Sequence, residues 1–301
     1  MYPIIKVPDD AFDLPEQLGT KQKFWYRNEE GQVHLFKQGR PNTGENWAEK
    51  VCCEICSLLG LPHAHYDFAT WRELNGVVTP KFVPENYRLV HGNELLARMV
   101  AGYQNEARYG ARQHTVSVVM AIMRSKLTGM PLGYVPPAQV ALASDVFTGY
   151  LMLDALVANQ DRHHQNWGLI VSPERKVSLT PTFDHAASLG RSELDEVRLR
   201  RLNTKDMNDN VEKYVERARS ALYRSNESPK PLSTLDAFRE AAKYAPTARD
   251  YWLGRLQDTS LGDYSAIIEK IPASVITEPS RRFALRMLEI NRGRLLQEMV
   301  R

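Results

Sequence analysis

The sequence predicts an α+β fold with a small β-rich part followed by a larger helical part. In residues 1–83, short β-type runs alternate with turn residues around one helical stripe. In residues 84–301, apolar residues recur at three- and four-residue spacing, and Pro and Gly separate the runs. The composition, 43% hydrophobic and 25% charged, is that of a folded globular protein, which excludes the disordered and fibrous classes.

The elements of the first part follow in chain order. The β-type runs "KFWYRN" and "QVHLFKQ" flank the turn "EEG", which predicts a hairpin over residues 23–38. An apolar stripe predicts a helix over residues 47–59, and Gly60 ends it. The runs "HAHYDFATW" and "GVVTPKFV" flank "ELNG" and indicate two further strands. We therefore expect a small sheet with one helix.

The second part is predicted to be helical apart from one hairpin. Four segments have helical periodicity: residues 92–103, 114–127, 137–159 and 280–300. Between Trp167 and Phe183, two β-type runs joined by "SPERK" predict a hairpin. This hairpin directly follows the decamer "NQDRHHQNWG", so a site in the decamer would be held rigidly.

Charge and cysteine content limit the possible partners and the location. The 39 Lys and Arg residues exceed the 36 Asp and Glu residues only slightly, so direct nucleic-acid binding is not expected. Cys52, Cys53 and Cys56 lie in the helical stripe without a second Cys/His pair at zinc-site spacing, so we expect buried free thiols, which suit a reducing compartment. The start of the chain has no signal-peptide apolar region, and no run approaches the roughly 20 apolar residues of a membrane span. We expect a cytoplasmic protein without membrane contact.

The decamer and the segment after the hairpin carry residue types that suit phosphoryl transfer. Asp161 and Asn166 are five residues apart, and Asp184 follows the hairpin. Phosphoryl transfer requires a carboxylate that orients or deprotonates the acceptor hydroxyl, and oxygen ligands for Mg²⁺ on the triphosphate. Upstream, Lys37 on a strand would neutralise phosphates, and Glu49 on the following helix would fix the direction of the amine. Taken singly, each signal is weak.

The chain resembles the HipA-like family of serine/threonine protein kinases over most of its length. "LFKQGRPNTGENWAEKVCCEICSLLGLPHA" is similar to the family's block of strand lysine, loop and helix glutamate. "ANQDRHHQNWGLI" resembles its catalytic loop, and "LTPTFDHA" its metal-binding segment. The resemblance implies a bilobed protein-kinase-like fold, with a small β-rich N-lobe (residues 1–83), a larger helical C-lobe (residues 84–301), and ATP and Mg²⁺ as cofactors.

The resemblance also implies roles for the matching residues. Asp161 would be the catalytic base or the carboxylate that orients the hydroxyl, while Asn166 and Asp184 would hold Mg²⁺. Lys37, braced by Glu49, would hold the α- and β-phosphates. The spacing from Asp161 to Asn166 equals that of protein-kinase catalytic loops. No G-x-G-x-x-G is present, so further nucleotide contacts would come from a short covering loop, "GTKQK", and an interlobe hinge: Gly19, Thr20, Lys21, Lys23, Lys81, Phe82 and Val83.

Two candidate catalytic residues each allow a second interpretation. His163 would either assist transfer of the acceptor proton or make structural hydrogen bonds. Glu54 is a rival to Glu49 as the partner of Lys37, although the distance from Glu49 to Gly60 fits the family block better.

Charged and hydroxyl side chains near the expected site also allow more than one role. Lys21 and Lys23 would either contact phosphate or be solvated turn residues. The charged stretch of residues 191–205 is either a solvated helix or a substrate-docking surface. Candidate positions for self-phosphorylation are Thr20, Ser188 and Ser192.

The resemblance implies a toxin-type kinase with a protein substrate, such as an aminoacyl-tRNA synthetase or another translation component. An antitoxin or companion subunit is also implied, because the chain is shorter than full-length HipA and is expected to lack its extra N-terminal subdomain. Arg162 and His163 follow the Asp in a "DRHxxN" order that phosphatidylinositol kinases also use, so a lipid or small-molecule kinase is one alternative. A catalytically silent pseudokinase that serves as a binding module is a second one.

Overall fold

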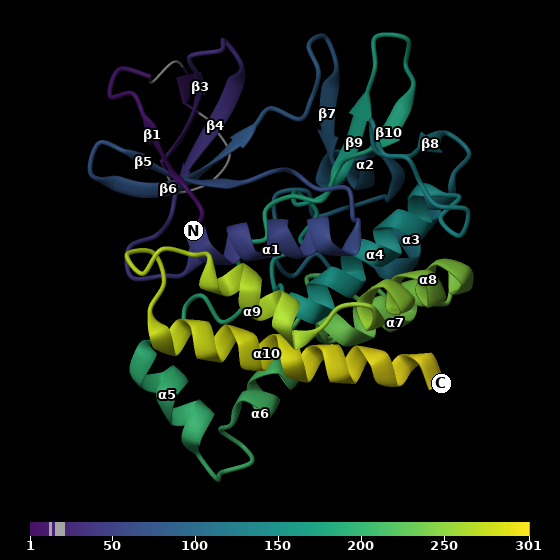
Figure 1. Ribbon diagram of the computed structural model, residues 1–301. Coiled ribbons are helices and arrows are strands. Elements are labelled where there is room, and N and C mark those ends of the chain that lie inside the picture. Colours follow the sequence, from purple (N-terminus) through teal and green to yellow (C-terminus); the bar gives the residue numbers. More distant parts are fainter. Residues whose placement is uncertain (12–13, 16–21, 301) are drawn as a thin grey trace.

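The structure is a computed structural model that describes residues 1–11, 14–15 and 22–300, so Gly19, Thr20 and Lys21 lie outside the described residues. A six-stranded sheet has, in spatial order, the strands β1 (Ile4–Val7), β5 (Asp67–Trp71), β6 (Leu74–Pro80), β4 (Val33–Gln38), β3 (Lys23–Arg27) and β2 (Leu14–Pro15). A second, four-stranded sheet has β7 (Arg88–His91), β9 (Gly168–Val171), β10 (Val177–Leu179) and β8 (Thr128–Gly129). Both sheets lie on the same side of the helices (Figure 1).

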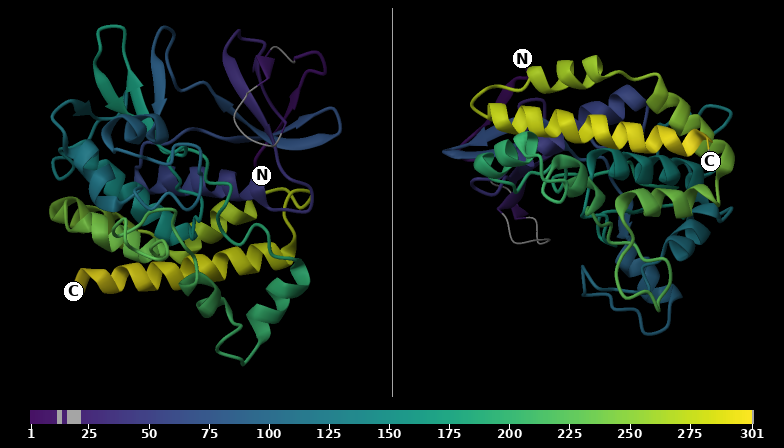
Figure 2. Two further views of the ribbon diagram at one scale, coloured as in Figure 1. Left: turned by 180° about the vertical axis from the view of Figure 1, so that it is seen from behind. Right: turned by 90° about the horizontal axis from the view of Figure 1, so that it is seen from below.

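Helix α1 (Glu45–Leu59) connects the six-stranded sheet to the helical part. It contacts β5 and β6 on one side and helices of the C-terminal region on the other. The remaining helices are α2 (Gly92–Met99), α3 (Val116–Arg124), α4 (Ala143–Val157), α5 (Asp195–Asn203), α6 (Val211–Glu216), α7 (Thr234–Ala242), α8 (Pro246–Gln257), α9 (Leu261–Glu269), α10 (Glu278–Leu296) and the 3-10 helix η1 (Gln297–Val300). Helix α10 runs along the face remote from the sheets, and α5 and α6 project beyond it (Figures 1 and 2).

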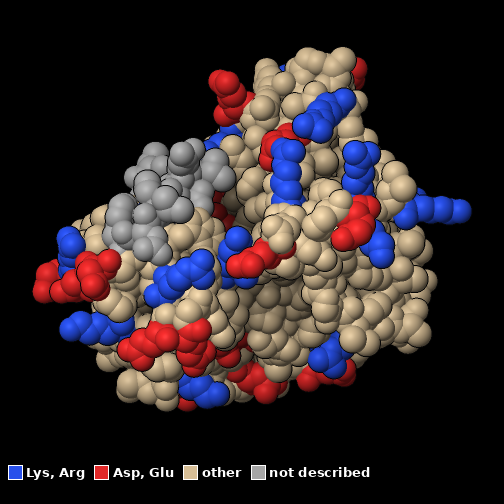
Figure 3. All heavy atoms as spheres, turned by 90° about the horizontal axis from the view of Figure 1, so that it is seen from above, with Lys and Arg blue, Asp and Glu red and all other residues tan. Residues whose placement is uncertain are grey.

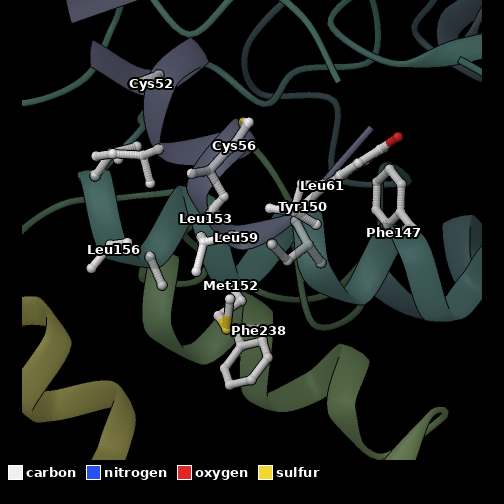
Figure 4. Packing of buried hydrophobic residues seen from close by; sticks show 14 of the residues in the cluster. Cys52, Cys56, Leu59, Leu61, Phe147, Tyr150, Met152, Leu153, Leu156 and Phe238 are labelled. Atoms are coloured by element: carbon white, nitrogen blue, oxygen red, sulfur yellow. The ribbon is translucent and has the colours of Figure 1, made fainter. Parts of the chain in front are cut away.

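The main apolar core joins α1 to the central helix α4. Cys56 of α1 lies on the side of Leu153 and Tyr150 of α4, Cys52 lies one turn further along α1, and Phe238 of α7 lies beyond α4 (Figure 4). Nearly every residue of α4 is buried, which explains why its sequence is apolar on all sides. The three cysteines are free and buried in this core, as predicted.

Most predicted elements are confirmed, and two predictions need correction. The hairpin over residues 23–38 is β3 and β4, and the hairpin between Trp167 and Phe183 is β9 and β10. Helix α1 begins at Glu45, two residues before the predicted start at Trp47. The polar residues of its first turn carry no apolar pattern that would have shown this start. The prediction that residues 84–301 contain only one hairpin besides helices was wrong, because β7 and β8 flank the hairpin of β9 and β10 and make a four-stranded sheet. Strands of four and two residues are too short to show an alternating pattern.

Two further predictions concern the boundary between the parts and the membrane. The six-stranded sheet uses residues up to Pro80, and the boundary at Val83 stays a prediction. None of the helices in the described ranges has the length and apolar character that a membrane span requires.

Candidate active site

Lys37 lies on the inner face of the six-stranded sheet. Side chains alternate along β4, so Phe36 packs into an outer apolar cluster while Lys37 points toward α1 and Asp184. Lys37 Nζ lies 3.1 Å from Glu49 Oε2 and 2.8 Å from Asp184 Oδ1. Burial opposes the charge of this amine, but attraction to Asp184 and Glu49 outweighs burial and holds the pKa of Lys37 well above its ordinary value. The amine is therefore a fixed positive charge between two carboxylates.

Glu49 of α1 uses both oxygens of its carboxylate. Its Oε2 faces Lys37, and its Oε1 accepts a 2.6 Å hydrogen bond from the backbone N of His185. Burial raises the pKa of Glu49, although Lys37 acts in the opposite direction. Glu54, the rival partner, lies instead 2.7 Å from Lys50. The structure thus places Glu49, and not Glu54, against Lys37.

Asp184 has a backbone conformation that non-glycine residues rarely adopt. Its φ is 62°, in the left-handed region, which costs on the order of 1 to 3 kcal/mol and persists only where the surroundings enforce it. Its backbone N donates to Tyr66 Oη at 3.3 Å, and the next backbone N is held by Glu49. This conformation directs the carboxylate toward Lys37.

Arg162 fixes the loop between α4 and β9 from within. Its buried guanidinium binds both oxygens of Asp154, through Nε at 2.7 Å and Nη2 at 2.8 Å. It also donates to the carbonyl of Asn166 at 2.9 Å and to Thr182 Oγ1 at 3.0 Å. One side chain therefore ties together α4, the loop of Asp161 and Asn166, and the segment before Asp184.

Replacing Arg162 by Met is expected to lower the free energy of unfolding by about 3 to 5 kcal/mol, because Asp154 stays buried without its partner. Urea unfolding followed by circular dichroism measures the change. The double variant Asp154→Leu/Arg162→Met should lose less, since it leaves no buried charge. Arg249→Met, on the surface of α8, serves as the control and should cost less than about 1 kcal/mol. A loss in Arg162→Met as small as in this control would contradict the argument.

Asp161 has its backbone fixed and its carboxylate turned outward. Asn159 Oδ1 accepts from the backbone N of Asp161 at 3.1 Å, and Asn166 Nδ2 donates to its carbonyl at 2.7 Å. The hydroxyl of Tyr109 donates to Asp161 Oδ1. The predicted pair of Asp161 and Asn166 is thus in direct contact, and the amide nitrogen of Asn166 is used for that contact, so its amide oxygen is the atom suited to a cation.

His163 lies beside Asp161, with its Nε2 3.5 Å from Asp161 Oδ1. The backbone N of Gln165 donates to His163 Nδ1 at 3.1 Å, so a neutral ring carries its proton on Nε2. Burial lowers the pKa of His163, which favours that neutral form. In this tautomer His163 donates toward Asp161, and this geometry favours the structural interpretation over acceptance of a proton.

An open hollow of about 340 Å³ adjoins Asp161. Its lining includes Tyr109, Arg191, Ser192 and Tyr214. On the sheet side of the molecule, Lys and Arg side chains alternate with Asp and Glu side chains without an extended area of one sign (Figure 3). The hollow brings aromatic and hydroxyl side chains together with one carboxylate, that of Asp161, and one guanidinium, that of Arg191.

The residues predicted to contact the nucleotide are only partly brought together. Lys23 pairs directly with Lys37 in the β3–β4 register, so both side chains lie on one face of the sheet. Phe82 is half-buried, with its ring centroid 5.6 Å from that of Phe183, next to Asp184. Val83 is also half-buried, and Lys81 is exposed.

The predicted metal ligands form a sparse set of oxygen donors. In the described part of the chain, no group of three or more His, Cys, Asp or Glu side chains is arranged to hold a metal ion. The carboxylate of Asp184 and the amide oxygen of Asn166 suit Mg²⁺, which uses few protein oxygens and completes its octahedron with water and phosphate. Arg162 donates to both the carbonyl of Asn166 and Thr182 Oγ1, so the loop of Asn166 and the segment before Asp184 lie side by side. The donor set fits Mg²⁺ in company with a nucleotide.

Sequence reasoning missed two residues that shape the site. Asp154 carried a usable signal, because an acid within an otherwise apolar buried helix needs a buried partner. Tyr109 carried none, since only the fold brings this residue to Asp161 from 52 residues away.

Comparison with known proteins identifies the family and the fold. A model of the HipA-like C-terminal domain matches residues 16–246. The Helicobacter pylori proinflammatory kinase CtkA has 18% identity and a TM-score of 0.73, with 99% of each chain covered. HipA of Shewanella oneidensis MR-1, solved with HipB and operator DNA, has 12% identity and a TM-score of 0.57, with 97% of this chain and 67% of that chain covered. A search of curated protein sequences finds no match. These similarities confirm the predicted bilobed protein-kinase-like fold.

Proposed function

Because the chain belongs to the family of the HipA-like C-terminal domain, we propose that it transfers the γ-phosphate of ATP, with Mg²⁺, to a serine or threonine hydroxyl of a protein. One observation carries the proposal. Lys37 Nζ lies 2.8 Å from Asp184, a residue 147 positions further along the chain, and 3.1 Å from Glu49. Such a fixed amine beside a carboxylate suits the binding of a metal-bound triphosphate.

We propose that Asn166 and Asp184 hold Mg²⁺ while Lys37 neutralises the α- and β-phosphates. Bound Mg²⁺ would supply positive charge that offsets negative charge on the phosphate oxygens. Glu49 keeps the Lys37 amine directed into the site, since its second oxygen is anchored by the backbone of His185. Lys23, on the same face of the sheet, would add charge near the phosphates.

Asp161 would orient the acceptor hydroxyl toward the γ-phosphate and receive its proton. The fixed backbone of Asp161 limits the movement of its carboxylate, and His163 donates toward Oδ1 of that carboxylate. The adjoining hollow would take the side chains around the acceptor residue. Phe82 and Val83 would contact the base of the nucleotide.

The partners are part of the same proposal. The Shewanella protein was solved with HipB and operator DNA. By analogy, we propose an antitoxin or companion subunit for this chain and a translation component, such as an aminoacyl-tRNA synthetase, as substrate. The cytoplasm is the compartment in which such partners would be met.

Incubation with γ-labelled ATP, Mg²⁺ and cell extract tests the proposal. We expect label to enter protein with the native chain and not with Asp184→Asn, which loses a metal ligand. Label that enters protein equally with both would overturn the mechanism. Label that enters lipid alone would show that the acceptor is a lipid and not a protein. If ATP and Mg²⁺ do not raise the unfolding temperature, the chain is a catalytically silent binding module.

The Tyr109 hydroxyl binds the Asp161 oxygen that an acceptor hydroxyl must approach. Replacing Tyr109 by Phe is therefore expected to raise kcat/KM for a general acceptor, dephosphorylated casein, by about threefold to tenfold, with nucleotide affinity unchanged. Hydrogen bonds to charged groups are worth about 1.5 to 3 kcal/mol, and the exposure of Tyr109 reduces that value. A fall in kcat would show instead that the phenol positions Asp161.

A further inference from the structure

A second, partly buried contact joins α1 to the segment that follows Asp184. Glu45, the first residue of α1, is only 3% exposed. Its Oε1 accepts a 2.6 Å hydrogen bond from Arg191 Nη1, and its Oε2 accepts one of 2.9 Å from the backbone N of Arg40. The backbone N of Gly44 also donates to the carbonyl of Arg191 at 2.7 Å. Arg191 is thus bound to the start of α1 through both its side chain and its backbone.

Glu45 and Glu49 lie four residues apart and therefore share one face of α1. Both face the same segment, because Glu49 accepts from the backbone N of His185 and Glu45 from the guanidinium of Arg191. The segment between these two contacts turns back on itself at Leu189 and Gly190, where φ is 55° and 66°. The segment is consequently fastened to α1 at both ends.

The same arginine lines the hollow beside Asp161. An acceptor in that hollow therefore lies next to a side chain that is hydrogen-bonded to α1. A partly buried ion pair such as this one is weak support for stability, because the cost of removing charge from water offsets much of the attraction. The ion pair of Glu45 and Arg191 lies between α1 and the segment after Asp184, and this position agrees better with a role in holding these two elements in place.

From these contacts, and resting on the function proposed above, we infer that Arg191 and Glu45 are positioning residues. They hold α1 so that Glu49 directs the Lys37 amine, and they link the acceptor side of the site to the nucleotide side. Neither residue would touch the reacting atoms.

The test compares Arg191→Met, Arg191→Lys and the double variant Glu45→Gln/Arg191→Gln in the full chain. Three quantities are measured: kcat for label transfer from γ-labelled Mg·ATP to casein, the Kd of a fluorescent ATP analogue with Mg²⁺, and the unfolding temperature. We expect Arg191→Met to lower kcat by about tenfold to a hundredfold, since small displacements of positioning groups have effects of this size. Its Kd should rise several-fold, and Arg191→Lys should recover part of both losses.

The double variant separates positioning from simple stabilisation. It removes the charges of both Glu45 and Arg191, so its unfolding temperature should lie closer to that of the native chain than the unfolding temperature of Arg191→Met does, while kcat stays low. Recovery of kcat together with the unfolding temperature, or native kcat and Kd in Arg191→Met, would overturn this inference alone. A native chain that transfers no label would overturn the proposed function and this inference with it. Arg249→Met, on α8, is the matched control and should behave as the native chain.

Discussion

The free energy of unfolding is expected to fall by about 4 kcal/mol for each pH unit between pH 6 and pH 5. Burial lowers the pKa of His114 to about 3 and that of His164 to about 4, and it lowers the pKa of His185 well below its ordinary value. In the unfolded chain each imidazole has a pKa of about 6.5. Below that pH the unfolded state binds protons on these three imidazoles that the native state does not bind, and each costs about 1.4 kcal/mol per pH unit. His163, whose pKa burial also lowers, adds to the loss. Glu49, with a raised pKa, offsets part of the loss.

Urea unfolding at pH 7, 6 and 5 measures the slope of the free energy of unfolding against pH. Two variants show which histidines cause this slope. His114→Gln should remove about a third of the slope, because His114 accepts from Trp167 Nε1 at 3.0 Å as a neutral ring. His65→Gln is the control. The hydrogen bond to Asp67 raises the pKa of His65 to about 10, so this histidine carries its proton in both states below pH 6. A slope that His114→Gln leaves unchanged would contradict the assignment.

The contacts that residue spacing suggested are those within short segments, whereas Asp184, 147 residues from Lys37, was expected at the site because of the family resemblance. Asp161 and Asn166 are separated by five residues within one loop, and their contact follows from that loop alone. Lys37 and Glu49 are twelve residues apart, on a strand and the helix that follows it. A strand followed by a helix folds back within a short connection, which makes this pair possible. Spacing and residue type were only a weak signal for it, and the family resemblance favoured Glu49 over Glu54.

The contacts that the sequence did not predict join distant segments. Arg191 and Glu45 are 146 residues apart, and their side chains are common surface types in any sequence. Only the placement of α1 across the segment after Asp184 makes Glu45 a buried residue. Residues 16–21, which include most of the predicted nucleotide-covering loop, lie outside the described residues, so their contacts stay a prediction.

Two kinds of polar group therefore surround the proposed site. Fully buried ones, such as Arg162 and His185, bond only to protein groups and fix backbone positions. Partly exposed ones, Asp161 and Asp184, have side chains that are 25% and 30% exposed. The buried groups set the geometry, and the partly exposed carboxylates are the groups that solvent and a ligand can reach. Substitutions in the first group should act mainly on stability, and those in the second mainly on activity.

Replacing Asp161 by Asn is expected to lower kcat for label transfer to casein by about 10²- to 10⁴-fold, the usual contribution of a positioned acid or base. Asn has nearly the same shape, and both backbone hydrogen bonds of position 161 remain, to Asn159 and Asn166. The loop should therefore keep its conformation. The amide, however, cannot accept the proton of the acceptor hydroxyl, so the loss falls on the chemical step.

Nucleotide binding and stability distinguish this loss from unfolding. The Kd of a fluorescent ATP analogue with Mg²⁺ should stay within about twofold of the native value, because Asn166, Asp184 and Lys37 are untouched. Asp250→Asn, on the exposed surface of α8, is the matched control and should leave kcat unchanged. If Asp161→Asn keeps kcat within tenfold of the native value, the acceptor is oriented by another group, and the role proposed for Asp161 is wrong.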